Sequence, residues 1–416
     1  ALQQAFCNVG LPYLVARHDL KTLAHFVDIC DDGRALVVQA MLEHGLAYDA
    51  IGERKSAFHF LAGIAGGFER GVDRNHAQEV DQANLVVQCI MFLKDKAFKE
   101  RWSLGTEAEY ALVSLAAGWA GVSGESSDHL IGALAKVLEQ GSDLATTESA
   151  IWLLATLAID VRSEESVSVL AGSALRSPDA EARAYAAQSL GEVVLALTSA
   201  VGSVEPSSRC IAALWALALT DASRRTRQQA AFTLAHLAVK SMDIPGNTTM
   251  ASVAALRDMA LRGVDDEDRL FAAWRLFETA NAAQGAHAAA TAECVAVLAR
   301  LAREADDDET REYAASMLEH LAVSLHGERA LSMQCISALK DMAASGRRAS
   351  DRTVAASRLF DAACSFDTDS FVFVAECVAA LSGVARKDRD DGVRAHALQL
   401  LDEVVALACD AEPGLR

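Results

Sequence analysis

Apolar side chains in the second half of the chain recur with the spacing of an amphipathic helix. One pattern appears five times, with a sixth, weaker copy: an arginine is followed by alanine at its third and fourth residues and leucine at its seventh. These positions fall on one face of an α-helix. The arginines that begin the copies, called anchor arginines below, are Arg183, Arg227, Arg269, Arg311, Arg352 and Arg394, with separations of 44, 42, 42, 41 and 42 residues. So regular a spacing predicts a helical repeat.

A second apolar helix is predicted before each of the last five anchor arginines. These helices occupy residues 210–219, 253–261, 294–302, 335–343 and 377–385. Polar, mostly acidic turns separate the two helices of a unit, as at residues 264–268 and 304–310, and their Asp, Ser and Thr side chains can cap the helix that follows. The unit is therefore a helical hairpin of about 42 residues, which must stack on its neighbours to bury its apolar faces.

The first part of the chain repeats less regularly. Anchor-type helices are predicted at 54–65, 107–120 and 148–158, with partner helices at 35–42, 84–93 and 129–138. We interpret the polar residues 66–83 as a connection inside the array. The whole chain, 1–416, is thus expected to be a single α-solenoid, with an N-terminal cap at 1–30, irregular repeats at 31–160, regular repeats at 161–410 and a tail at 411–416.

On these repeats the chain resembles the armadillo/HEAT family over roughly residues 30–410, and most strongly over 165–407. The resemblance implies an all-α, right-handed α–α superhelix of roughly eight to ten helical hairpins. It also implies that the last helix of each repeat lines a concave groove that holds extended peptides. The period and the Asp- or Ser-rich turns favour the armadillo form, and two-helix HEAT repeats stay open because the linkers show no clear glycine between short helices.

The nuclear-import adaptors of this family carry a tryptophan and, four residues later, an asparagine on each groove helix. The tryptophan position corresponds to the fifth residue after each anchor arginine, and the chain has Gln188, Phe232, Trp274, Ser316, Ser357 and Gln399 there. Only Trp274 matches, and no asparagine follows it. Binding of nuclear-localisation signals by that ladder is therefore not expected.

The ninth residue after each anchor arginine forms a column of charged or titratable side chains. It contains Glu192, His236, Glu278, His320, Asp361 and Glu403. Stacked helices would space such a column at about 10 Å. The candidate partner-binding groove consists of this column together with Phe232 and Trp274, and its carboxylates could pair with Lys or Arg of an extended segment. The alternative is an ordinary solvated face, with His236 and His320 as surface histidines and not pH sensors.

Charge and cysteine content restrict the partners and the compartment. The formal net charge of −19 disfavours nucleic acid and favours basic or polar protein segments. No apolar run approaches the roughly 20 residues of a membrane span, and residues 1–11 show no leader pattern. Nine cysteines without a CxxC pair indicate a reducing compartment, the cytosol or alternatively the nucleus. Five of them share one helical position with Val253 and are interpreted as small buried hydrophobes: Cys89, Cys210, Cys294, Cys335 and Cys377.

No catalytic, metal or cofactor motif is found in the sequence. The acidic run 306–309 lacks the glycine and terminal glutamate of a calcium loop, and residues 121–127 match no nucleophile or phosphate loop. We therefore predict a non-catalytic scaffold or adaptor that binds a protein segment. The alternative is a structural subunit of a large assembly, which contacts neighbours through its ends and edges. Self-association through the ends is open as well, whereas an enzyme on this scaffold has no support in the sequence.

Overall fold

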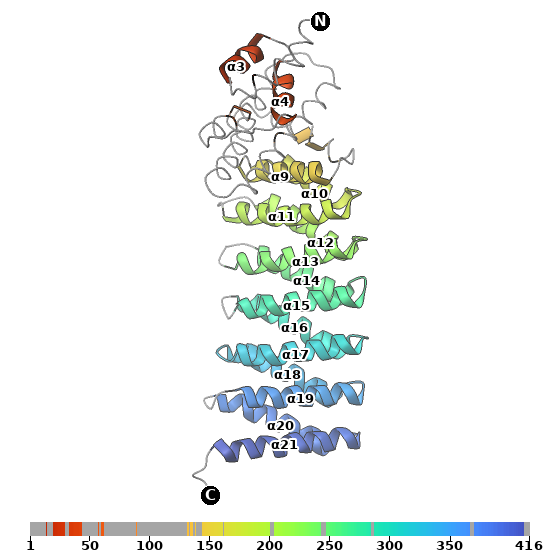
Figure 1. Cartoon of the computed structure of the whole chain (residues 1–416). Coiled ribbons are helices and arrows are strands. Elements are labelled where there is room, and N and C mark those ends of the chain that lie inside the picture. The colour runs from red at the N-terminus through yellow and green to blue at the C-terminus, as the bar shows by residue number, and fades with distance from the viewer. Residues whose placement is uncertain are drawn as a thin grey trace. The chain divides into compact units, whose positions relative to one another are not determined.

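The computed structural model contains only helices in the residues that it describes (Figure 1). The chain divides into two compact units, Ala1–Leu197 and Thr198–Arg416. The described residues are 20–29, 33–43, 144–160, 162–199, 204–242, 247–283, 287–366 and 370–411, with isolated positions between 14 and 138.

The first unit contains five described helices: α3 (Leu20–Ile29), α4 (Gly33–Glu43), α9 (Leu144–Asp160), α10 (Glu164–Arg176) and α11 (Ala180–Ser199), the last of which ends just inside the second unit. Helix α3 packs on α4, and α9 packs on α10. The predicted helices at 35–42 and 148–158 are confirmed within α4 and α9. Those at 54–65, 84–93 and 107–120, like the connection 66–83, lie wholly or mostly outside the described residues, and the described half of 129–138 is helical.

The second unit is a stack of helical hairpins (Figure 1). Every helix packs against its neighbour in sequence and against the next but one, which places the odd-numbered helices in one layer and the even-numbered helices in the other. Each repeat therefore has two helices, and both predicted sets are confirmed. The helices are α12 (Val204–Thr220), α13 (Arg224–Lys240), α14 (Thr248–Arg262), α15 (Asp266–Ala283), α16 (Ala288–Glu304), α17 (Asp308–Ser324), α18 (Arg329–Ser345), α19 (Ala349–Ser365), α20 (Phe371–Lys387) and α21 (Asp391–Ala411).

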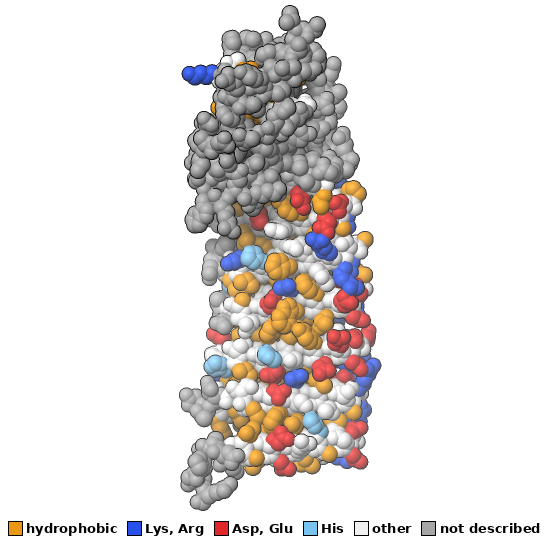
Figure 2. All heavy atoms as spheres, viewed as in Figure 1, with side chains coloured by type: hydrophobic (Ala, Val, Ile, Leu, Met, Phe, Trp, Pro, Cys, Tyr) orange, Lys and Arg blue, Asp and Glu red, His pale blue; other side chains and the backbone are white. Residues whose placement is uncertain are grey.

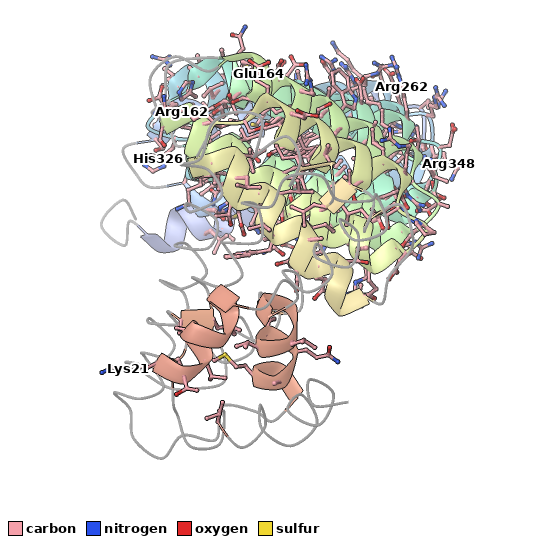
Figure 3. The ribbon with its side chains drawn as sticks, turned by 90° about the horizontal axis from the view of Figure 1, so that it is seen from above. Lys21, Arg162, Glu164, Arg262, His326 and Arg348 are labelled. Atoms are coloured by element: carbon pink, nitrogen blue, oxygen red, sulfur yellow. The ribbon has the colours of Figure 1, made fainter. Side chains whose placement is uncertain are left out.

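Turns and linkers occupy opposite edges of this unit. Figure 3 looks along the stack and places Arg262 and Arg348, which flank hairpin turns, on one side. His326, in the connection between α17 and α18, lies on the other side. The two edges are therefore built from different segments, and the outer faces of the two helix layers lie between them.

Small side chains fill the contact between repeats. The alanine pair and leucine of the repeat pattern are fully buried, as with Ala230, Ala231 and Leu234 in α13. Alanine lets helices approach closely and loses no rotamer entropy on burial. The predicted cysteine column is buried too, and burial raises the pKa of its thiols to about 12, which keeps them protonated and unreactive at neutral pH.

The anchor arginines have a structural role that the repeat spacing does not reveal. Nη1 of Arg311 donates to the carbonyl oxygens of Ala305 and Asp306, at 2.6 and 2.9 Å, and so satisfies the C-terminal end of α16. Its Nε donates to Oδ1 of Asp351 in the next repeat, at 2.9 Å. The same cross-repeat pairing joins Arg227 to Asp268 and Arg352 to Asp388. One guanidinium thus ties a turn to the helix before it and to the repeat after it.

The acidic turns cap the anchor helices, as predicted. Asp307 precedes α17, and its carboxylate accepts a hydrogen bond from the backbone N–H of Thr310 at 2.7 Å. That hydrogen bond holds the pKa of Asp307 below its usual value. Asp308 pairs with Arg311 and with Arg348 of the next repeat. Within the described residues, no group of three or more His, Cys, Asp or Glu side chains could hold a metal ion.

None of the described helices is both long enough and apolar enough to cross a bilayer.

We predict that Arg311→Ala lowers the free energy of unfolding by about 3 to 5 kcal/mol, because it leaves the buried carboxylate of Asp351 without its partner. Urea titration followed by circular dichroism measures the change. Arg300→Ala is the control: it removes an exposed pair with Glu304 and should cost no more than about 0.5 kcal/mol. Equal losses in the two variants would show that the anchor arginine is not a stabilising tie.

Candidate partner-binding face

The candidate site lies on the outward side of the odd-numbered helices of the second unit, called here the odd-helix face. On the view in Figure 2, apolar side chains gather near the middle of this unit, level with α15, and acidic side chains lie beside them. The face is formed by α13, α15, α17, α19 and α21, each packed on the next in the same layer.

Seven of the eight predicted site residues lie on these five helices. Phe232 and Trp274 are 46% and 37% exposed, which is unusual for large apolar side chains in this protein. The remaining column members of the second unit are all at least partly exposed: His236, Glu278, His320, Asp361 and Glu403. The eighth residue, Glu192, is exposed on α11 in the first unit.

Aromatic rings from neighbouring repeats meet on this face. The ring of Trp274 lies 5.4 Å from that of Phe277 and 6.2 Å from that of Tyr313, centroid to centroid. Phe277 in turn meets the ring of His320 edge to face at 6.4 Å. With Phe232 these rings form what we call the aromatic cluster. Such offset and edge-to-face contacts hold the rings in place although Tyr313 is 39% exposed.

A guanidinium group lies within the aromatic cluster. The Cζ of Arg275 is 4.8 Å from the ring centroid of Phe232 and 4.7 Å from that of Phe271. Cation–π attraction at these distances fixes both rings and the arginine. Nη1 of Arg275 also donates to Glu278 at 2.6 Å, while its Nε is buried with no hydrogen-bond partner. The guanidinium of Arg275 therefore bridges the rings of Phe232 and Phe271 and adds one cation to this aromatic surface.

Every carboxylate of the ninth-residue column is hydrogen-bonded. The donor is an arginine or glutamine side chain three or four residues earlier in the same helix. Arg358 donates to Asp361 at 3.1 Å, as Arg275 does to Glu278. The remaining pairs use glutamine, with Gln188 to Glu192 at 3.4 Å and Gln399 to Glu403 at 3.0 Å. Glu278 and Asp361 are thus largely neutralised by a neighbouring guanidinium, and the face is less acidic than the column alone suggests.

Glu319 is a buried carboxyl next to the column. Its Oε2 lies 3.0 Å from Nδ1 of His320, and that nitrogen is also 2.8 Å from the carbonyl oxygen of Ser316. Burial raises the pKa of Glu319; His320 and Arg358 oppose the rise, and Asp361 adds to it. A proton on this carboxyl is therefore retained more strongly in the folded chain than in the unfolded one.

Sequence reasoning missed Phe277 and Tyr313 of the aromatic cluster, and it missed Phe271 and Arg275, which contact each other beside Phe232. Phe271 and Tyr313 occupy the second residue after their anchor arginines, and Tyr185 and His396 occupy the same position in other repeats. This column of rings was readable from the sequence. Two repeats later in the chain, Arg358 and Phe360 occupy the positions of Arg275 and Phe277. Glu319 shares the position of Phe277, and nothing in the sequence marks its burial.

No protein-family model matches the chain, and no curated protein matches it. Among solved structures, that of the Pds5–Scc1 complex aligns over 96% of this chain and 67% of the other, with 12% identity and a TM-score of 0.51. An engineered protein aligns over 95% and 98%, with 21% identity and a TM-score of 0.33. The karyopherin Kap121p, bound to the extreme C-terminus of the phosphatase Cdc14p, aligns over 94% and 45%, with 14% identity and a TM-score of 0.34.

The chain has the armadillo/HEAT-type α-solenoid fold. The two-layer hairpin stack and the alignment with the Pds5–Scc1 complex agree on this point. In the described repeats of this solenoid each unit has two helices, which is the HEAT-like arrangement left open by the sequence. At this level of identity the likeness concerns the fold, so the function must be argued from the face itself.

Glu319→Gln should raise the melting temperature at pH 7, because it removes a buried carboxyl whose pKa is raised on folding. A raised pKa means that stability is lost as pH rises through the window above the ordinary value of 4.5. Below 4.5 the wild-type carboxyl is protonated, so the difference between variant and wild type should shrink. Thermal melts of wild type and Glu319→Gln, recorded from below pH 4.5 up to pH 7, measure this difference in melting temperature. Glu312→Gln is the control, and it should leave the melting temperature unchanged because Glu312 is exposed on the same helix. A Glu319→Gln protein that melts below wild type at pH 7 would show that the pKa of Glu319 is not raised by folding.

Proposed function

We propose that this solenoid is a non-catalytic protein-interaction scaffold whose odd-helix face binds an extended segment of a partner protein. The aromatic cluster supports the proposal most directly. Phe232, Trp274 and Tyr313 come from three successive repeats and are among the large apolar side chains that the structure leaves exposed. Rigid, partly exposed aromatic side chains are the commonest energetic anchors of protein interfaces, because they bury a large area at little entropic cost.

The charge around the cluster favours a segment that carries basic or polar side chains. Glu312 is exposed next to Tyr313 on α17. Glu403 is exposed farther along the face, on α21, and its carboxylate accepts a hydrogen bond from the neutral Gln399. These carboxylates remain available for Lys or Arg. Glu278 and Asp361 contribute less, because each already has an arginine partner. We therefore propose that apolar contact with the aromatic cluster supplies most of the affinity and that the carboxylates select against acidic partners.

The six described cysteines are free thiols. This is what a reducing compartment would maintain, so we propose the cytosol or the nucleus as the place where the scaffold acts.

A subunit of a large assembly is the second candidate, because apolar side chains are also exposed outside the odd-helix face. Phe371 and Val372 begin α20 in the other layer and are 73% and 45% exposed. An assembly contact at this edge would bury them. The two candidates differ in which residues a partner covers, and this difference can be measured.

Trp274→Ala should weaken binding by about 2 kcal/mol or more, roughly thirtyfold, because the indole is the centre of the aromatic cluster. The ligands are short peptides selected against the intact chain from a random display library, and isothermal titration gives their affinities. Phe371→Ala is the matched control, since it removes a more exposed ring from the other layer. Peptides that lose affinity to Phe371→Ala and keep it with Trp274→Ala would favour the assembly-subunit function.

Neutralising the column should reduce binding at low salt only. The variant Glu278→Gln/Asp361→Asn/Glu403→Gln should bind the same peptides several-fold more weakly at low salt. The difference should vanish near 1 M salt, where the screening length falls to about 3 Å. The control Glu304→Gln/Glu328→Gln/Asp341→Asn removes the same charge from even-numbered helices and their linkers. An equal loss in both triple variants would mean that only net charge matters and that the column selects nothing.

A further inference from the structure

Two pairs of aromatic rings occupy equivalent places on the odd-helix face. In each pair one ring is the fifth residue after an anchor arginine, and the other is the second residue after the next anchor arginine. The first ring pair is Phe232 of α13 and Phe271 of α15, and the second ring pair is Trp274 of α15 and Tyr313 of α17. The rings of the second pair are in contact, with centroids 6.2 Å apart. The repeat therefore presents the same pair of positions twice, one hairpin apart.

The same two positions also meet where they carry no aromatic pair. In α19 and α21 they are Ser357 and His396, and Oγ of Ser357 lies 2.9 Å from Nε2 of His396. The packing of successive odd-numbered helices thus brings the fifth residue of one helix to the second residue of the next, for side chains of quite different types. The two ring pairs can therefore be compared position by position.

The first ring pair binds a cation of the chain itself. Cζ of Arg275 lies 4.8 Å from the ring centroid of Phe232 and 4.7 Å from that of Phe271, within the roughly 6 Å range of cation–π attraction. Nη1 of Arg275 donates to Glu278 at 2.6 Å, so one carboxylate balances the charge. These positions therefore accommodate a guanidinium on two rings, with a carboxylate beside it.

The second ring pair receives no cation from the described part of the chain. The equivalent of Arg275 in α17 is Met317, the sixth residue after its anchor arginine, whose apolar side chain is only 4% exposed. No described Lys or Arg lies over the ring of Trp274 or Tyr313. Both rings are open to solvent instead, with 37% and 39% of their surfaces exposed. The second ring pair thus has the rings of the first pair without its guanidinium.

Exposed carboxylates lie next to the second ring pair. Glu309 precedes Tyr313 by four residues, about one turn of α17, and Glu312 precedes it directly. Both glutamates are exposed. Arg275, which follows Trp274 in the chain, is already paired with Glu278. The surroundings of the second ring pair therefore combine accessible aromatic faces with negative charge, the two features that attract a cation.

We propose that an arginine of the partner segment stacks on Trp274 and Tyr313, in the place that Arg275 takes on the first ring pair. The inference rests on the proposed function, in which the odd-helix face binds an extended protein segment, and it names the side chain that this face selects. Arginine suits the place better than lysine does, because its planar, weakly hydrated guanidinium stacks on rings while its N–H groups stay free to meet Glu309 or Glu312.

Citrulline has nearly the shape of arginine without its charge, so exchanging the two tests the proposal. The probes are the peptides selected against the intact chain, synthesised with each arginine in turn replaced by citrulline or by lysine, and isothermal titration gives their affinities. Peptides that depend on Trp274 should contain one arginine whose replacement by citrulline weakens binding about tenfold, and lysine should recover only part of that loss. Equal affinities of the arginine and citrulline forms, or full recovery by lysine, would overturn the proposal.

Variants of the second ring pair locate the effect. Tyr313→Leu keeps apolar area but removes one aromatic face, and it should lower the preference for arginine over citrulline, whereas Tyr313→Phe should keep it. Met317→Arg supplies the guanidinium from the chain itself and should remove the preference. The control Gln334→Arg adds the same charge at an exposed position of α18 and should leave the preference unchanged. Circular dichroism melts establish which variants are folded. A preference that survives Tyr313→Leu would place the arginine elsewhere and contradict the proposal.

These measurements separate a wrong arginine site from a wrong function. Peptides that bind Trp274→Ala as tightly as wild type would show that the segment does not bind at the aromatic cluster, and both proposals would fall. Peptides that lose affinity for Trp274→Ala, yet bind equally with arginine or citrulline, would leave the scaffold function standing and show that the arginine site alone is wrong.

Discussion

A buried guanidinium carries a charge that must be matched and donors that must all find acceptors, and three anchor arginines of this solenoid each join one repeat to the next in this way. Arg227, Arg311 and Arg352 each satisfy carbonyl oxygens at the end of the preceding helix and a carboxylate in the following repeat. Because two different elements must be in place to satisfy one side chain, the arginine fixes the turn and the stacking register together. Arg269 keeps only the turn contact: it donates to the carbonyl oxygen of Gly263 and pairs with Asp266 of its own helix.

The alanine-rich contacts between repeats follow from the same constraint. A guanidinium can reach a carboxylate in the next repeat only if the helices approach closely, and alanine at the contact positions allows this approach. Larger side chains are then displaced to the outer faces. On α13, α15 and α17 they form the aromatic cluster. The candidate interaction surface therefore lies outside the contacts between repeats, where side chains need not be small.

Net charge and local charge differ in this protein. The chain carries −19 formal charges, yet many of its carboxylates are occupied as helix caps, as partners of anchor arginines, or by an arginine three residues earlier. The charge of a surface in this protein therefore cannot be obtained by counting its Asp and Glu residues alone. On the odd-helix face the two arginine-bonded carboxylates leave a mixed surface, in which aromatic area outweighs charge as a source of affinity.

The sequence by itself determined the fold class, the two-helix hairpin and most helix positions from 210 onward, because helical periodicity and turn residues act locally. It also identified Phe232, Trp274 and the ninth-residue column as members of one helix layer, since equal positions in a repeat fall on equal faces. Other features required the tertiary structure. Whether Trp274 meets Tyr313, whether Arg275 lies between two rings and whether Glu319 is buried depend on how successive repeats rotate and approach. The pairing of Arg311 with Asp351 likewise joins residues 40 positions apart, where no local rule of sequence applies.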